Sequence, residues 1–191
     1  AYGKSGELTN KLVLTKDAPL GDAFVGVDNT FASRILDEGV IDASAAVDLP
    51  EGADRYIIDD TPALTPIDFG EVCINIDTAW FAEHGVIPPA AFEDLTGADY
   101  KDLFVAINPS TSSTGLAFLL ATVGHFGTGE AGGFADYWKR LAANGMRIDE
   151  GWSDAYYTDF SGGGEGGAHP IVVSYSSSPA ATLTENGSAS T

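Results

Sequence analysis

The sequence predicts an α/β fold in which helices cover a sheet. Apolar runs of strand length alternate along the chain with segments whose apolar residues recur every three or four positions. Polar segments follow several of the strands directly, as happens where a strand leads into a helix in a layered sheet. The apolar share of 44% and the mean hydropathy of +0.03 suffice for one large domain or two lobes.

Four runs have the length and the apolar content of strands, namely residues 23–27, 72–76, 103–107 and 171–175. A shorter apolar stretch covers residues 146–148. We expect these runs to form the sheet. Ligands of open α/β sheets bind beyond the carboxyl ends of the strands, so the segments that follow these runs are the candidate functional segments.

Three helices are predicted from the spacing of apolar residues. The first begins at Thr30 and ends before Gly39, the second runs from Thr114 to about Gly124, and the third covers residues 134–141. Each has a glycine at its end or shortly beyond it, where a helix commonly stops. Alternation of these helices with the strands gives the α/β order.

The segment N-P-S-T-S-S-T-G-L-A-F-L-L at residues 108–120 places a run of hydroxyls at the start of a helix. One side-chain oxygen is enough to cap a helix, so the others are not needed for folding. The first turn of a helix also attracts anions through its N–H groups. Ser112, Ser113 and Thr114 are therefore either part of an ordinary capped loop or a site for a phosphate, sulfate or carboxylate group.

Three further polar segments have the same position relative to a strand: G-V-D-N-T (26–30), G-W-S-D-A-Y-Y (151–157) and S-Y-S-S-S-P-A (174–180). Asp28 in the first is either a helix cap or a contact for a positively charged group. Trp152 lies between Gly and Ser at a predicted helix start, which suits stacking on a flat ring better than core packing. The same applies, less strongly, to Tyr156, Tyr157 and Tyr175.

The composition excludes several classes of function. A formal charge of −19, from 28 acidic and 9 basic residues, repels nucleic acid and anionic lipid, so we expect no nucleic-acid partner. No apolar run approaches the roughly 20 residues that span a bilayer. The single cysteine, Cys73, lies in V-C-I-N-I and is expected to be a small core residue. It provides neither an intrachain disulfide nor a cysteine metal site.

Catalytic and cofactor motifs are missing from the sequence. No G-x-S-x-G, H-E-x-x-H or phosphate-loop pattern is present, and no histidine pairs visibly with a nucleophile. We therefore expect no catalytic residues, no resident metal and no cofactor. The strongest metal alternative is a phenolate iron site formed by Tyr156, Tyr157 and Tyr175. The segment S-G-G-G-E-G-G at residues 161–167 is interpreted as a flexible surface connection without a function.

Taken in order, G-V-D-N (26–29), D-F-G (68–70), the hydroxyl run, G-W-S-D-A-Y (151–156) and S-Y-S-S-S-P-A (174–180) resemble the thiamine-binding solute-binding proteins of bacterial ABC importers. This resemblance implies the two-lobed type II periplasmic-binding-protein fold. It implies capture of thiamine or its phosphates for a membrane permease, without chemistry, by a monomer. The expected location is the periplasm or the extracellular space, with or without a lipid anchor.

The resemblance also implies which residues contact the ligand. Asp28 would contact the cationic part of thiamine, the hydroxyl run would contact the phosphate side, and an aromatic pair would supply stacking and polar contacts. The ligand-binding residues implied in this way are Asp28, Ser112, Ser113, Thr114, Trp152, Tyr175 and Ser176. Two alternatives stay open, a ferric-iron-binding protein of the same fold and an enzyme acting on a phosphorylated or thiamine-like substrate.

The same family pattern divides the chain into lobes. Residues 1–70 are expected to form part of lobe I, residues 71–77 a hinge crossing, and residues 78–191 mostly lobe II. The family has a further strand before the first of these segments and a long part after the last. The resemblance therefore implies a fragment with an incomplete first lobe.

Overall fold

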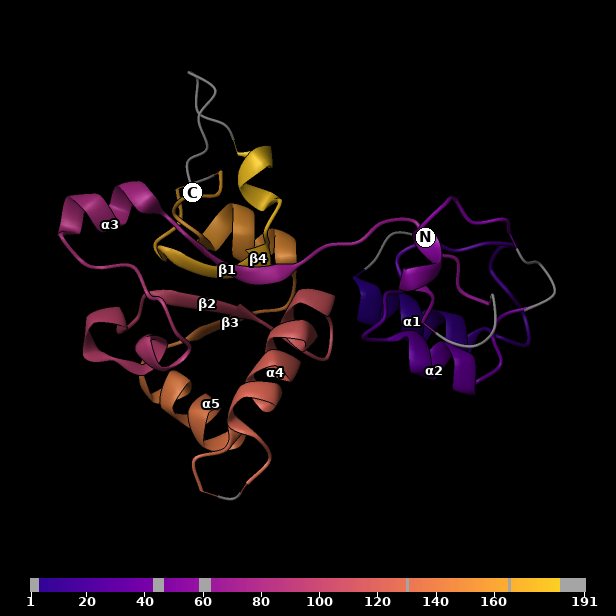
Figure 1. Cartoon of the computed structure of the whole chain (residues 1–191), viewed down its shortest axis with the longest axis horizontal. Coiled ribbons are helices and arrows are strands. Elements are labelled where there is room, and N and C mark those ends of the chain that lie inside the picture. The colour runs from indigo at the N-terminus through magenta and orange to yellow at the C-terminus, as the bar shows by residue number, and fades with distance from the viewer. Residues whose placement is uncertain (1–3, 43–46, 59–62, 130, 165, 183–191) are drawn as a thin grey trace. The chain divides into compact units, whose positions relative to one another are not determined.

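The computed structural model describes residues 4–42, 47–58, 63–129, 131–164 and 166–182. The chain divides into two compact units, residues 1–69 and 70–191. The second unit contains a four-stranded sheet in the order β1-β4-β2-β3 (Figure 1). Its strands are β1 (Val72–Ile76), β2 (Phe104–Ile107), β3 (Arg147–Asp149) and β4 (Ile171–Tyr175).

The sheet is mixed. Strand β2 lies between β3 and β4 and is parallel to both, whereas β1 pairs with β4 in the antiparallel direction. The strands predicted at 72–76, 103–107 and 171–175 are confirmed, and the short apolar stretch at 146–148 overlaps β3. Because three strands are parallel, their carboxyl ends lie at the same edge of the sheet.

The helices of the second unit are α3 (Thr78–His84), α4 (Ser113–Phe126) and α5 (Phe134–Ala143), with 3-10 turns η2 (Glu93–Thr96), η3 (Ala98–Tyr100) and η5 (Ser178–Ala181) and a π-helical turn η4 (Asp154–Asp159). The helices predicted from Thr114 and over 134–141 are confirmed as α4 and α5. Helix α3, which the sequence analysis did not name, begins after Asp77, whose carboxylate accepts the N–H groups of Ala79 and Trp80.

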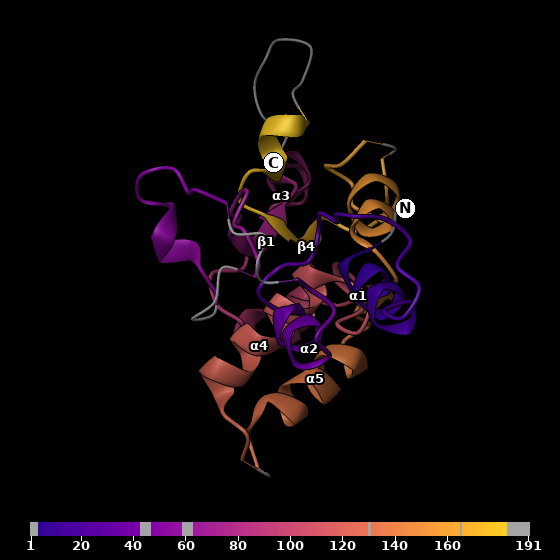
Figure 2. The ribbon, with the colours of Figure 1, turned by 90° about the vertical axis from the view of Figure 1, so that its right-hand side faces the viewer.

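The two faces of the sheet pack against different helices, because successive side chains of a strand point to opposite faces. On one face, Phe104 and Val173 belong to a cluster that includes Phe118 of α4 and Tyr137 of α5. On the other face, Val105, Ile107 and Val172 pack against η4. Figures 1 and 2 show α4 and α5 on one side of the sheet and η5 on the other.

Strand β1 is an edge strand, and only one of its faces packs against the core. Val72, Ile74 and Ile76 contact the cluster of α4 and α5. Cys73 alternates with them and is exposed, so the prediction that it is a core residue is wrong. The apolar letters around Cys73 suggested burial on both faces, which is typical of a central strand and not of an edge strand.

The first unit contains helices α1 (Ser5–Leu14) and α2 (Ala32–Asp37) and a 3-10 turn η1 (Ala53–Tyr56). Helix α2 confirms the helix predicted after Thr30, whereas α1 was not predicted. The strand predicted at 23–27 is wrong, because no strand forms in the described part of this unit and Val25 is 72% exposed. A strand needs a neighbouring strand for its hydrogen bonds, and here it has none.

Part of the glycine-rich connection after η4 is packed, which corrects the interpretation of residues 161–167 as a flexible connection at residues 161–163; residue 165 lies outside the described residues. Gly163 is buried, and a Cβ atom there would lie 1.7 Å from the carbonyl oxygen of Tyr156. Ser161 donates its hydroxyl to Asp77 and its N–H to the carbonyl oxygen of His169. Glycine at 163 therefore permits a close approach to η4, and the bonds of Ser161 fix the start of the connection.

Candidate ligand-binding site

Three of the four predicted polar segments meet at one edge of the sheet of the second unit. They follow the parallel strands β2, β3 and β4, and they contain the hydroxyl run, Trp152 and the pair Tyr175 and Ser176. This edge is where ligands of α/β sheets bind. The fourth segment, with Asp28, lies in the first unit.

The first two hydroxyls of the run shape the loop between β2 and α4. Ser110 donates its hydroxyl to Asn108 Oδ1 at 2.8 Å, and Thr111 donates its hydroxyl to the carbonyl oxygen of Glu150 at 2.8 Å. Asn108 Nδ2 also donates to the Glu150 carboxylate, at 3.0 and 3.2 Å. These bonds join the loop after β2 to the loop after β3, so Ser110 and Thr111 have structural roles.

The next three hydroxyls lie at the start of α4 and are nearly inaccessible to solvent. Ser112, Ser113 and Thr114 are 7%, 8% and 1% exposed. Ser112 occupies the N-cap position, but its side chain does not cap the helix and instead pairs with the Thr114 hydroxyl at 2.9 Å. Ser113 Oγ is buried and has no hydrogen-bond partner among the described residues. Folding thus leaves the Ser113 hydroxyl unused.

A glycine brings the start of α4 against the end of β2. A Cβ atom on Gly115 would lie 2.3 Å from the carbonyl oxygen of Ile107, the last residue of β2. Any side chain at this position would push the helix away from the strand. Gly115 therefore fixes where the first turn of α4, with its N–H groups and hydroxyls, stands at the sheet edge.

Trp152 is partly buried, which corrects the prediction that its position suits a core poorly. Its ring stacks on the ring of Tyr156, with centroids 5.1 Å apart and planes 13° apart, and it packs against the cluster under η4. Its Nε1–H donates to Ser174 Oγ at 2.8 Å. The sequence context of Trp152 gave no sign of these contacts, because they come from β4 and from the π-helical turn η4.

The end of β4 contributes a second group of hydroxyls. Ser174 Oγ lies 2.7 Å from Ser178 Oγ, and Ser178 Oγ accepts the N–H of Tyr175 at 3.2 Å. Tyr175 is partly buried, and Ser176 is exposed, with its N–H bonded to the carbonyl oxygen of Glu71 at 2.9 Å. Ser174 was not among the predicted site residues. Successive side chains of a strand point to opposite faces, so Ser174 lies on the other face of β4 from the predicted residue Tyr175.

Asp28, the predicted cation contact, makes local bonds in the first unit. Its Oδ1 atom accepts the N–H of Thr30 at 2.9 Å and also the Thr30 hydroxyl. Its carbonyl oxygen accepts the N–H of Phe31 at 3.1 Å, immediately before α2. The side chain is half-buried. Asp28 therefore stabilises the turn that leads into α2 with one carboxylate oxygen.

The tyrosines of the iron alternative have other partners. Tyr156 is fully buried, its ring stacks on Trp152, and its hydroxyl lies 3.1 Å from Thr182 Oγ1. The ring of Tyr157 is 39% exposed and stands edge-on to Tyr156 at 5.6 Å. Within the described ranges, no group of three or more His, Cys, Asp and Glu side chains could hold a metal ion.

A charged cluster that the sequence analysis missed lies at the end of β3. Arg147 Nε donates to Asp149 Oδ1 at 2.9 Å, and its terminal nitrogen lies 2.9 Å from Asp159 Oδ2. Asp149 is 6% exposed, and its Oδ2 atom is buried and has no hydrogen-bond partner in the part of the chain that the structure describes. Burial raises the pKa of the Asp149 carboxyl, with a further upward contribution from the Asp159 carboxyl, while Arg147 acts in the opposite direction.

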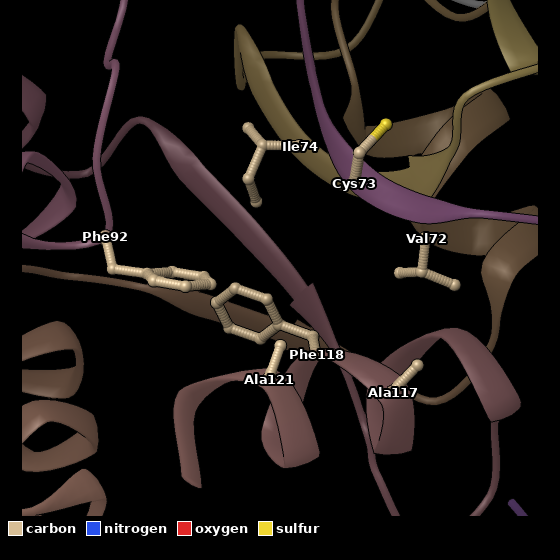
Figure 3. Close-up of a pocket in the computed structure, with 7 residues that line it drawn as sticks. All are labelled: Val72, Cys73, Ile74, Phe92, Ala117, Phe118 and Ala121. Carbon is tan, nitrogen blue, oxygen red and sulfur yellow. The ribbon is translucent and has the colours of Figure 1, made fainter. Parts of the chain in front are cut away.

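An apolar cavity of about 300 Å³ lies between β1 and α4 (Figure 3). Its lining residues are Val72, Cys73, Ile74, Phe92, Ala117, Phe118 and Ala121. Although Cys73 is exposed, partial desolvation of its thiol raises the pKa of that group above its ordinary value. The lining side chains carry no charge and no hydroxyl, so this cavity does not match the cationic and polar groups of thiamine.

Residues 18–183 match the family model described as bacterial extracellular solute-binding protein. Among curated proteins, the chain is 28% identical over 186 residues to the thiamine-binding periplasmic protein of Salmonella typhimurium strain LT2 and 26% identical over 182 residues to that of Escherichia coli strain K12. Each alignment covers 93% of this chain and 50% of the relative, so the chain spans about half the length of these relatives.

Solved structures show the same fold. A periplasmic thiamin-binding protein matches 97% of this chain with a TM-score of 0.74 and 24% identity, covering 54% of that protein. The periplasmic binding protein AfuA from Actinobacillus pleuropneumoniae, with fructose-6-phosphate bound, matches 91% of this chain with a TM-score of 0.68 and 19% identity, covering 53% of that protein. The predicted α/β fold of the type II periplasmic-binding-protein class is confirmed, and the iron and enzyme alternatives are not favoured.

Proposed function

Because the chain belongs to the family of bacterial extracellular solute-binding proteins, we propose that it forms part of a protein that captures thiamine or a thiamine phosphate. The two curated relatives are thiamine-binding periplasmic proteins, which supports this choice of ligand. The acidic composition, with a formal charge of −19, also favours a cationic ligand over a purely anionic one.

The observation that carries the proposal is the unused hydroxyl of Ser113. A buried hydroxyl without a partner costs roughly 1–3 kcal/mol, and a ligand oxygen at the start of α4 would remove this cost. The first N–H groups of a helix also lack partners within the helix and favour an anionic group. We assign Ser112, Ser113 and Thr114 to the hydroxyethyl or phosphate end of the ligand.

The rest of the ligand is assigned to the neighbouring segments. Thiamine has flat aromatic rings, one of them a cation. Trp152 lies shortly after β3 and Tyr175 is the last residue of β4, and we assign these two aromatic residues to the rings of the ligand. Ser176 lies next to Tyr175 and is exposed. Asp28 has a second carboxylate oxygen besides the one bonded to Thr30, and we assign it to the cationic part of the ligand.

The remaining parts of the proposal concern the whole protein. We propose that it delivers the ligand to the permease of an ABC importer, acts as a monomer outside the cytoplasm and performs no chemistry. Residues 71–77 are proposed to be a hinge crossing between a first lobe that includes residues 1–70 and a second lobe. None of the helices in the described ranges is both long and apolar enough to cross a membrane.

Substitution of Ser113 by Ala tests the proposal in the full-length protein. The variant loses an unpaired hydroxyl, so its melting temperature should stay unchanged or rise. Its affinity for thiamine phosphate, measured by calorimetry, should fall about tenfold, which corresponds to about 1.4 kcal/mol. Its affinity for thiamine should fall less, because thiamine lacks the charged group at this end.

Thr122→Val is the matched control. Thr122 is also buried in α4, but its hydroxyl donates to the carbonyl oxygen of Leu119 at 2.7 Å and accepts the indole N–H of Trp138 at 2.9 Å. This variant should have a lower melting temperature and an unchanged affinity for both ligands. Unchanged affinity for thiamine phosphate in Ser113→Ala, or equal losses for the two ligands, would refute the assignment of the hydroxyls to the phosphate end.

A further inference from the structure

The segment from Asp149 to Asp159 begins at the end of β3, carries Trp152 and Tyr156, and ends with the π-helical turn η4. A π-helical turn is rare and is found frequently at functional sites. One arginine contacts both ends. Arg147 donates from Nε to Asp149 at 2.9 Å, and its terminal nitrogen lies 2.9 Å from the carboxylate of Asp159.

We propose that Arg147 is a positioning residue, which clamps the two ends of this segment together and thereby holds Trp152 at the sheet edge. This proposal rests on the function proposed above, in which Trp152 contacts the ligand. The ion pairs differ from an ordinary surface pair in two ways. They close a loop of the chain, and one partner, Asp149, is almost completely buried.

Arg147 neutralises two carboxylates, those of Asp149 and Asp159. Asp149 and Asp159 both lie 2.9 Å from the Arg147 guanidinium, and the Asp159 carboxyl contributes to the raised pKa of Asp149. Without a cation, these two carboxylates would repel each other, and Asp149 would be a buried charge without compensation. The strand packed beside β3 is β2, and residues 104–107 of β2 carry no charge that could replace the guanidinium.

Other contacts hold the same region but do not neutralise the carboxylates. The N–H of His169 donates to the carbonyl oxygen of Asp159 at 3.0 Å, and the N–H of Asn108 donates to the carbonyl oxygen of Asp149 at 2.8 Å. Both are backbone bonds of the same chain and remain in an Arg147 variant. These bonds should keep the sheet and both attachment points of the segment folded. Loss of Arg147 leaves the two carboxylates without their shared cation, so the segment between them should loosen locally.

The test uses the full-length protein and the variant Arg147→Met, with two measurements. Amide hydrogen exchange, measured without ligand, should become faster in residues 150–159 and stay unchanged in α4. Affinity for thiamine, measured by calorimetry, should fall at least tenfold. The double variant Arg147→Met/Asp159→Asn removes one of the two repelling carboxylates, so both the slow exchange and most of the affinity should return.

Lys139→Met is the control, because it removes a surface ion pair of 3.1 Å with Asp136 on α5 that does not touch the segment. It should change neither measurement. Unchanged exchange in Arg147→Met would overturn the clamp, and so would a loss of affinity that Asp159→Asn does not restore. If the wild-type protein binds no thiamine, the proposed function fails, and the exchange measurement alone then decides whether Arg147 clamps the segment.

Discussion

Trp152 combines packing and the proposed ligand contact in one side chain. The indole stacks on Tyr156 and donates its N–H to Ser174, so truncation to Ala removes packing together with any ligand contact. Truncation of a fully buried Trp costs about 3–5 kcal/mol, and this half-buried one should cost less. A milder change is therefore needed to separate the two roles, and Trp152→Phe retains an aromatic face while it removes the N–H.

We predict that Trp152→Ala lowers the affinity for thiamine at least tenfold, or about 1.4 kcal/mol, and also lowers the melting temperature. Trp152→Phe should lose some stability, because the indole N–H bond to Ser174 is absent, but keep more than half of the binding free energy that Ala removes. Calorimetry and thermal unfolding of both variants measure this. A matched change, Trp138→Phe, breaks the bond to Thr122 and should affect stability alone. Normal affinity in Trp152→Ala would mean that Trp152 only packs.

The candidate site could be predicted from the sequence only in part. The hydroxyl run and Trp152 lie in short motifs that follow strands, so their location at the sheet edge could be predicted from the sequence. The motifs did not reveal which hydroxyls make hydrogen bonds within the loop after β2 and which one has no partner among the described residues. The partner of Thr111, for example, is Glu150, which belongs to the loop after β3. The contact of Trp152 with Ser174 joins residues 22 positions apart and was equally invisible.

At the scale of elements, helix α4 contains two glycines with different surroundings, and only Gly115 fixes the position of the helix. Gly115 faces the carbonyl oxygen of Ile107, where a Cβ atom would lie only 2.3 Å away. Gly124 lies in the same helix, and a Cβ atom there would meet nothing within 4 Å. A substitution by Ala is thus a steric conflict at the first position and a gain in helix propensity at the second.

We predict that Gly115→Ala lowers the melting temperature and weakens thiamine binding, because it moves the first turn of α4 away from β2. Gly124→Ala should stabilise the protein by about 0.5–1 kcal/mol without a change in affinity. Thermal unfolding and calorimetry on the two variants check the pair. Normal binding and stability in Gly115→Ala would show that the start of α4 tolerates displacement.

The elements predicted correctly from the sequence are those with a partner nearby in the fold. Helices α4 and α5 and strands β1, β2 and β4 belong to the second unit, where apolar periodicity matches real packing faces. The run at 23–27 has the composition of a strand but no strand beside it in the described part of the first unit. The prediction of a strand from composition alone was therefore wrong. The prediction that Cys73 is buried failed for a related reason, because an edge strand packs only one of its faces against the core.

At the scale of the whole molecule, the excess of negative charge is the dominant property. The formal charge is −19, and the ion pairs found in the described ranges, such as Lys16 with Glu38, are mostly exposed. Exposed pairs contribute little to stability, so self-repulsion of the acidic surface is poorly compensated. Salt screens such repulsion, with a Debye length of about 30 Å at 0.01 M and about 3 Å at 1 M.

We predict that the melting temperature of the ligand-free protein rises as NaCl increases from about 0.01 to about 1 M, because screening removes repulsion between carboxylates. The association rate of cationic thiamine should fall over the same range, since the acidic field no longer attracts it. Thermal unfolding and stopped-flow fluorescence measure the two effects. A melting temperature that falls with salt would mean that ion pairs outweigh the repulsion.

The most direct test of the account is calorimetric titration of the full-length protein with thiamine, thiamine phosphate and ferric iron. The account predicts saturable binding of thiamine or thiamine phosphate at one site per molecule, tighter than the binding of iron, because Ser113 and Trp152 suit an aromatic cation with a polar end. Tight iron binding with the charge-transfer colour of tyrosinate, together with no heat from either form of thiamine, would contradict it.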